Sequence, residues 1–297
     1  MLTLRFFAQR ADGEHPGFDQ SQTHRFLHEH WDLAIDLRVD ADTRIVLCHL
    51  PATFRVGFES PDYSDRLTMA IPHAIPRGFE YNIGLHQSLL MLRLVRSVAD
   101  LFGPREATGD LLRERLCNTG VDAVDLSPAR GRLLVACNPT SGRALKNWPL
   151  ERFARLVGWL ARELDVAVLL LGGRDDAAAV AQIVGHCGSA NIISAVGRTT
   201  LPQSVGLLAE ASMFVGNDSG LAQIAARLGL PTVVIFSGVD PTSMWVPLGP
   251  RVTALKAPVA CSPCNKLQES ECYGERACTL NISEQGVRAA VRKHLLT

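Results

Sequence analysis

The chain has 297 residues, long enough for two domains with buried cores, and its 30 basic and 30 acidic side chains give a formal net charge of zero. This balance argues against a nucleic-acid partner and leaves a small molecule as the expected one, with at most peripheral membrane contact. No apolar run reaches the roughly 18 residues of a membrane-spanning helix, and residues 1–15 lack the pattern of a signal peptide. A cytoplasmic protein is therefore expected, either free or at the inner face of the inner membrane.

The first half of the chain predicts a small α/β layer, although residues 1–30 carry no clear pattern. Two buried strands, a short helix and a long amphipathic helix are expected at residues 32–37, 54–58, 41–50 and 82–102. Residues 60–80 are rich in proline and predict an irregular connection. The polar stretch 106–130 has no strong period, so we place the domain boundary within it, with domains at 1–125 and 126–297.

The second half alternates strands with helices. Strands are expected at residues 133–137, 166–171, 191–195, 211–215 and 232–236, and helices at 150–164, 176–184 and 201–211. Such alternation implies a parallel sheet with helices on both faces, whose strands all end at one edge. We therefore expect the three turns that follow strands, at residues 138–148, 172–176 and 216–220, to converge there.

The stretch Ala211–Phe236 carries the most consistent local signals. Asn217, Asp218 and Ser219 follow an apolar run and are residue types that cap a helix, which Gly229 should end in a left-handed cap. The start of such a helix directs free N–H groups and the positive end of its dipole into a crevice, and Gly220 would let a phosphate or diphosphate reach the backbone. The alternative is that Asp218 and Ser219 only cap the helix.

The other two turns carry further candidates for a nucleotide ligand. In the first, Ser141 and Gly142 can offer a hydroxyl and backbone N–H groups, and Lys146 can offer an ammonium, to a diphosphate. In the second, Asp176 can accept hydrogen bonds from ribose hydroxyls. Each has an ordinary alternative, because the lysine could be solvated and the aspartate could be a helix cap. Trp148 is expected to pack its loop.

The chain contains eight cysteines. Four are scattered and are expected to pack as small apolar side chains: Cys48, Cys117, Cys137 and Cys187. The other four follow the pattern C-x2-C-x7-C-x5-C: Cys261, Cys264, Cys272 and Cys278. Close thiols in a cytosolic chain more often hold a metal than form disulfides, so a structural zinc or iron site is expected. The alternative is four reduced thiols in a loop.

The order of the motifs NPTSG…KNWP, LLLGGRDD, GRTTLPQ, GNDSGLAQIAARLGLPTVVIFSGVDPTSMWVPLG and CSPC…C…C resembles glycosyltransferase family 9, the ADP-heptose:lipopolysaccharide heptosyltransferases and their relatives. The resemblance runs from about residue 133 to the C-terminus and is fainter over 32–58. It implies a GT-B-like fold of two Rossmann-like domains with parallel sheets, of which the N-terminal one is incomplete here. It also implies inverting transfer of a sugar from a donor such as ADP-heptose to a glycan, lipopolysaccharide-core or protein hydroxyl, with no catalytic metal.

The resemblance also assigns roles to the residues of the three turns. Lys146 and Asp218 become the catalytic candidates, with Asp218 orienting its loop or touching the sugar. The donor diphosphate and ribose would be bound by Ser141, Gly142, Asp176, Ser219, Gly220 and Leu221. As the bond from sugar to phosphate breaks, negative charge grows on the leaving diphosphate, and a fixed ammonium with helix-end N–H groups stabilises that charge.

Two departures from the family pattern limit this interpretation. Gln223 stands where the family commonly has a histidine, which leaves the donor preference open. The family's first strand is followed by a Gly-Asp loop that supplies the base for the acceptor, and no such segment precedes Asp32. Four carboxylates without a motif remain as candidate bases: Asp12, Glu14, Asp36 and Asp40. Two alternatives therefore stay open, a nucleotide-sugar-binding or assembly protein without transfer, and a metal-dependent interaction module formed by the cysteines.

Overall fold

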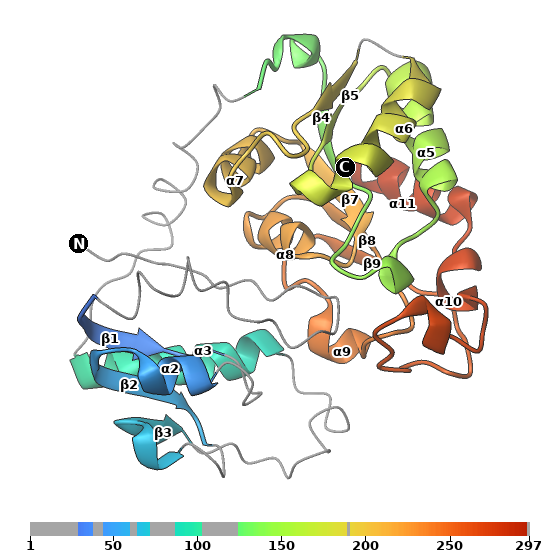
Figure 1. Cartoon of the computed structure of the whole chain (residues 1–297). Helices are drawn as coiled ribbons and strands as arrows, with labels where there is room; N and C mark the ends of the chain where they lie inside the picture. The colour runs from blue at the N-terminus through green and yellow to red at the C-terminus, as the bar shows by residue number, and fades with distance from the viewer. Residues whose placement is uncertain are drawn as a thin grey trace. The chain divides into compact units, whose positions relative to one another are not determined.

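A computed structural model describes residues 29–37, 44–59, 64–71, 87–102, 124–188 and 191–295. The chain divides into two compact units, residues 1–106 and 107–297, drawn from blue to teal and from green to red in Figure 1. The boundary that we place at residue 125 stays a prediction, because residues 103–123 lie outside the described ranges.

The first unit contains a parallel three-stranded sheet in the order β1-β2-β3. Its strands are β1 (Trp31–Ile35), β2 (Ala52–Phe58) and β3 (Met69–Ile71), and its helices are α2 (Arg44–His49), the 3-10 turn η2 (Ser64–Arg66) and α3 (Gln87–Phe102). Leu90, Leu94 and Val98 recur every four residues along α3 and pack on Val56 and Phe58 of β2. The expected strands and helices are present, with bounds shifted by a few residues.

One expectation for this unit is wrong. Residues 60–80 were predicted to be irregular, whereas Met69–Ile71 pairs in parallel with Val56–Phe58 as strand β3. A strand of three residues is too short to show a period of its own. Its conformation is set by hydrogen bonding to the neighbouring strand, which a local pattern does not report.

The second unit is built on a six-stranded sheet in the order β6-β5-β4-β7-β8-β9, and every neighbouring pair is parallel. Its strands are β4 (Leu134–Asn138), β5 (Ala167–Leu170), β6 (Ile192–Ser194), β7 (Met213–Asn217), β8 (Thr232–Ile235) and β9 (Val252–Leu255). Counted within this unit, the order is 3-2-1-4-5-6, which is the arrangement of dinucleotide-binding sheets. The expected parallel sheet is therefore confirmed, and β9 is an additional edge strand that its half-buried, four-residue sequence did not reveal.

Helices cover both faces of this sheet, as the alternating pattern predicts. The α-helices are α5 (Leu150–Glu163), α6 (Ala177–Cys187), α7 (Leu201–Ala209), α8 (Gly220–Arg227), α9 (Thr242–Trp245), α10 (Ala277–Leu280) and α11 (Glu284–Leu295), and the 3-10 turns are η4 (Ser127–Ala129), η5 (Ala144–Lys146), η6 (Arg174–Asp176) and η7 (Glu269–Glu271). α5, α6 and α11 pack on the face that carries Val135, Val168 and Val215. α7 and α8 pack on the opposite face, against Ala136 and Phe214, because successive strand residues point to opposite faces.

Local caps explain where the two helices on this second face begin and end. At the start of α7, Thr200 donates its N–H to Gln203 Oε1 over 2.8 Å, and Gln203 donates its N–H back to Thr200 Oγ1 over 3.4 Å. Ser219 caps α8 by accepting from the Ala222 N–H over 3.3 Å. Gly229 follows α8 with φ +82°, which confirms the predicted left-handed cap. These caps fix the position of the turn between β7 and α8.

Candidate functional site

The second sheet has its topological switch point between β4 and β7. The strand order reverses there, so the connections leave these two neighbours in opposite directions and open a crevice at their carboxyl ends. The loop after β4 runs from Pro139 to Pro149 and contains the 3-10 turn that ends at Lys146. The turn after β7 consists of Asp218 and Ser219 and leads directly into α8. The candidate residues of the first and third turns therefore lie at the same edge of the sheet, at its switch point.

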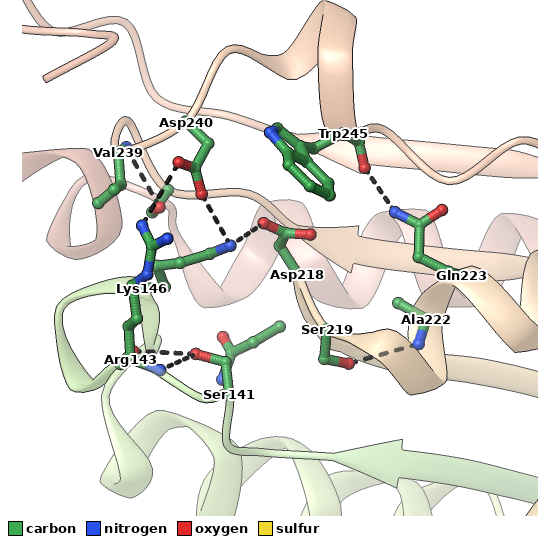
Figure 2. A network of polar contacts seen from close by, with 12 residues as sticks. Ser141, Arg143, Lys146, Asp218, Ser219, Ala222, Gln223, Val239, Asp240 and Trp245 are labelled. Atoms are coloured by element: carbon green, nitrogen blue, oxygen red, sulfur yellow. Dashed lines mark hydrogen bonds and ion pairs between the residues drawn. The ribbon is translucent and has the colours of Figure 1, made fainter. Parts of the chain in front are cut away.

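A network of four charged side chains joins these turns (Figure 2). The Lys146 ammonium forms ion pairs with Asp218 Oδ2 and with Asp240 Oδ2, the latter over 3.0 Å. Arg143 Nη1 lies 3.5 Å from the other carboxylate oxygen of Asp240. The Lys146 side chain is 14% exposed and that of Asp218 is 6% exposed. Two cations and two carboxylates thus balance in a largely desolvated place, where charge interactions are stronger than in water.

The charge of Asp218 depends on its neighbours in this network. Burial raises the pKa of the Asp218 carboxyl above its ordinary value of 3.8, and the negative charge of Asp240 adds to this effect. Lys146 acts in the opposite direction, by its charge and by its hydrogen bond. A carboxyl group with a perturbed pKa in a crevice, held by a specific cation, is the pattern of a functional site.

Asn217 and Ser141 hold the loop after β4 in place. Asn217, the last residue of β7, is fully buried; its amide accepts from the Trp148 N–H over 2.9 Å and donates to the Pro139 carbonyl over 2.7 Å. The Ser141 hydroxyl bonds within the loop, to the Arg143 carbonyl at 2.9 Å and to Asn147 Oδ1 at 2.7 Å. The structure therefore places Ser141 as a residue that shapes the loop around Lys146.

The two glycines of these turns face open space. Apart from its chain neighbours and the backbone of its own helix, a Cβ atom added at Gly142 or Gly220 would have no atom of the described residues within 4 Å. At Gly220 this space adjoins the first N–H groups of α8, including that of Leu221, which have no partner inside a helix. The backbone at Gly220 is therefore not covered by other side chains, and binding of a phosphate there stays a prediction.

Asp176 lies in the second turn, between β5 and α6. Its Oδ2 accepts from the Gly173 N–H over 2.7 Å and lies 2.8 Å from where a Cβ on Gly172 would stand. The carboxylate thus stabilises its own turn but makes no side-chain cap bond to α6, so the cap alternative is not borne out, and its binding of ribose stays a prediction. Asn138 ties this turn to the end of β4 by donating to the Leu171 carbonyl over 2.8 Å.

Asp240, Arg143 and Asn217 belong to the site but were not among the predicted residues. Asp240 follows β8, the strand next to β7, in the sequence Gly-Val-Asp-Pro. The turns that follow parallel strands all lie at the same edge of the sheet. The position of Asp240 after β8 was therefore the signal that could have identified it as a site residue. Arg143 stands three residues before Lys146 in the same loop. The local pattern marks Asn217 only as a possible helix cap, whereas the structure uses it to hold a loop 69 or more residues away.

Two neighbouring side chains have packing roles. Trp148 is fully buried, donates from Nε1 to the Ile282 carbonyl over 3.0 Å and meets Phe153 edge to face, which confirms that it packs the loop. Gln223, at the family's histidine position, donates from Nε2 to the Trp245 carbonyl over 2.6 Å. This bond ties α8 to α9 beside the site.

Two of the four cysteines that were expected to pack as small apolar side chains are buried. Cys137 and Cys187 are buried, and burial raises the pKa of the Cys137 thiol to about 12; Cys48 is half-buried and Cys117 lies outside the described residues. Across the described ranges, no three metal-binding side chains gather into a site. The late thiols are all free, and they range from exposed to buried: Cys261, Cys264, Cys272 and Cys278. They do not fit a tetrathiolate as arranged, so metal binding stays a prediction.

One candidate base is committed to a structural contact. Asp36 is buried at the end of β1, where its Oδ2 accepts from Arg44 Nε over 2.9 Å. Arg44 is fully buried and also donates to the Phe58 carbonyl; a Cβ on Gly57 would lie only 2.9 Å from the Arg44 guanidinium carbon. This ion pair fixes α2 to the first sheet, which argues against Asp36 as the base. The other candidates, Asp12, Glu14 and Asp40, lie outside the described residues.

Comparison with known proteins identifies the family. The glycosyltransferase family 9 (heptosyltransferase) pattern matches residues 21–273. This chain is a member of glycosyltransferase family 9. The family 9 chain is 26% identical over 219 residues to lipopolysaccharide heptosyltransferase 3 of Escherichia coli, a match that covers 71% of this chain and 60% of that protein. It is 32% identical over 115 residues to lipooligosaccharide heptosyltransferase 2 of Haemophilus ducreyi, covering 37% of this chain and 33% of that protein. The chain thus spans 60% or less of the length of these relatives.

Two solved heptosyltransferase structures share the fold. The match to E. coli ADP-heptose lipopolysaccharide heptosyltransferase II has a TM-score of 0.61 at 20% identity and covers 96% of this chain and 81% of that one. The match to E. coli heptosyltransferase WaaC with ADP has a TM-score of 0.61 at 16% identity and covers 93% of this chain and 78% of that one. The predicted fold class, α/β and GT-B-like with two parallel-sheet units, is therefore confirmed. Within the described ranges, the three-stranded first sheet is compatible with an incomplete N-terminal domain, and no helix is long and apolar enough to cross a membrane.

Proposed function

We propose that this family 9 chain is an inverting glycosyltransferase that moves a heptose from an ADP-heptose-like donor to a hydroxyl of a glycan, lipopolysaccharide core or protein. Family membership and the heptosyltransferase relatives support this assignment. A cytoplasmic location, with contact at the inner face of the inner membrane, belongs to the same proposal, as does the absence of a catalytic metal. The four-cysteine segment would have a structural role.

The observation that carries the proposal is the position of Lys146. Its ammonium comes from the loop after β4 and pairs with Asp218, directly before the start of α8, at the switch point of a dinucleotide-type sheet. An ammonium has three N–H donors, and the carboxylates of Asp218 and Asp240 take two of them. The third is left for an oxygen of the donor diphosphate, beside the open backbone of Gly220.

The chemistry of the proposed reaction matches these groups. The bond from the anomeric carbon to the diphosphate oxygen breaks while the acceptor oxygen forms a bond on the opposite face of the sugar. The electron pair leaves with the diphosphate, where Lys146, Arg143 and the N–H groups at the start of α8 would stabilise the new charge. The acceptor proton goes to a carboxylate base. With Asp36 bound to Arg44, the predicted candidates for this base are Asp12, Glu14 and Asp40.

The test follows release of ADP from ADP-heptose, with and without acceptor glycans. Wild type should release ADP, and Lys146→Ala should lower kcat by about 100-fold or more, as removal of one charge-stabilising donor commonly does. Lys293→Ala is the matched control, since Lys293 is exposed on α11, and it should keep wild-type kinetics. Binding of donor by wild type without any release would favour the alternative, a nucleotide-sugar-binding protein without transfer.

A further inference from the structure

The cysteine segment, defined here as residues 261–280, contacts two of the three turns that carry the charged network, those after β4 and β8. Its first contact is with the turn after β8. Cys264 donates its N–H to the Gly238 carbonyl over 3.1 Å, and Asn265 donates to the Val239 carbonyl over 2.8 Å. These are the two residues before Asp240. Gly238 is also packed so closely that a Cβ on it would lie 2.9 Å from Cys278 Cβ. The segment therefore sets the path of the backbone that leads into Asp240.

The second contact reaches the loop that carries Lys146. Arg276 donates from Nη2 to the Asn147 carbonyl over 2.6 Å, one residue after Lys146. The same guanidinium donates from Nη1 to Glu269 Oε1 over 2.7 Å, and the Arg276 N–H is directed at Cys272 Sγ over 3.4 Å. Glu269 and Cys272 both belong to the cysteine segment. Arg276 is thus anchored on its own segment and bonded to the loop after β4 by a charge-assisted hydrogen bond.

The backbone of the segment is strained at these contacts. Asn265, Glu275 and Arg276 have φ values of 53°, 48° and 59°, in the left-handed region that side chains other than glycine rarely adopt. Asn265 and Arg276 are also the residues that bond to the turn after β8 and to the loop after β4. Such conformations persist where the surrounding structure holds them, and they cluster at functional sites.

We propose that the cysteine segment is a clamp that positions the diphosphate site, with Arg276 as its positioning residue. Through Arg276 the segment holds Lys146, and through the backbone bonds to Gly238 and Val239 it holds Asp240. Lys146 Nζ lies 3.0 Å from Asp240 Oδ2. A shift of either turn therefore changes this ion pair and the position of the ammonium at the proposed diphosphate site. The proposal rests on the function proposed above and extends it to residues outside the crevice that fix the position of its cation.

Kinetics and ADP binding test the clamp through Arg276→Ala. We expect its ADP affinity and kcat/KM to fall by about tenfold, or about 1.4 kcal/mol. Arg276→Lys keeps a cationic donor and should recover most of the ADP affinity. Glu269→Gln should also lower the ADP affinity, because it weakens the bond that anchors Arg276. Arg251→Ala is the matched control, because Arg251 donates over 3.2 Å to the Gly229 carbonyl, before the amino end of β8. Wild-type affinity in both Arg276→Ala and Glu269→Gln would overturn the clamp.

Amide hydrogen exchange tests the clamp in the absence of any nucleotide-sugar. It therefore separates failure of the clamp from failure of the proposed function. In Arg276→Ala, exchange should rise by about tenfold in residues 143–148, and in Arg251→Ala it should stay at the wild-type rate there. Should Arg276→Ala not fold, Glu269→Gln takes its place. If wild type neither binds ADP nor releases it, the proposed function fails, and the exchange rates alone decide the clamp. Equal exchange in residues 143–148 of wild type and both clamp variants would refute it.

Discussion

Removal of the Lys146 ammonium should destabilise the second unit in a manner that depends on pH. At an effective dielectric constant of about 20, unit charges at the 3.0 Å separation of Lys146 and Asp240 attract by about 5.5 kcal/mol. Part of this attraction is offset in wild type by the desolvation of the ammonium. In Lys146→Ala, Arg143 still faces Asp240, but Asp218 is left buried beside another carboxylate. We expect a loss of about 3 kcal/mol at neutral pH, the low end for breaking a buried pair.

Protonation of Asp218 limits this loss and gives it a pH dependence. Its pKa is already raised by burial and should rise further without Lys146, so the folded variant holds a proton that the unfolded chain releases above its ordinary pKa of 3.8. For a carboxyl whose pKa is higher in the folded than in the unfolded chain, the folded state is most stable below the unfolded-state pKa. It loses stability as the pH rises through the folded-state pKa. At pH 4.5, 0.7 units above 3.8, the cost of keeping Asp218 protonated is only about 1 kcal/mol. The loss should therefore shrink from about 3 to about 1 kcal/mol between pH 7.5 and pH 4.5.

Urea unfolding of wild type and Lys146→Ala at both pH values measures this difference. Tryptophan fluorescence is a suitable signal, because Trp148, Trp159 and Trp245 lie in the second unit. The double variant Lys146→Ala/Asp218→Asn should recover most of the loss at neutral pH, since no unpaired charge remains at Asp218. Lys293→Ala should stay within about 0.5 kcal/mol of wild type. An equal loss at both pH values, or no recovery in the double variant, would refute the reasoning about Asp218.

Three further changes test separate parts of the site. Asp240→Asn removes one anchor of the Lys146 ammonium and should lower kcat/KM for ADP release by about tenfold; unchanged kinetics would show that Asp240 does not position the lysine. Gly220→Ala adds a methyl group to open space, so its melting temperature should stay within about 2 °C of wild type while KM for the donor rises about tenfold; an unchanged KM would mean that no anion reaches this backbone. Trp148→Phe removes the bond to the Ile282 carbonyl and should cost about 1 to 2 kcal/mol in urea unfolding, and a loss below about 0.5 kcal/mol would contradict that role.

The cysteine segment shows where local patterns stop being informative. The spacing of Cys261, Cys264, Cys272 and Cys278 predicts a metal site, but the structure does not gather the thiols into one. Elemental analysis of wild type against Cys261→Ser and Cys264→Ser tests that prediction. The contacts that the segment does make, through Arg276 and the backbone beside Gly238, depend on residues 26 to 129 positions away and carry no spacing signature.

The sequence by itself determined the local architecture of the second unit. Short apolar runs, period-3.6 patterns, the Ser219 cap and the Gly229 cap predicted its first five strands and the α8 turn, because such signals depend on neighbours a few residues away. The same patterns placed Lys146 and Asp218 in turns at one sheet edge. Only the tertiary structure decided which turns meet there. The strand order put the turn after β8 beside the other two, so Asp240 became the second partner of Lys146. Strand β3 and Asn217 escaped prediction for the same physical reason, because their conformation and role are set by partners that are distant in sequence.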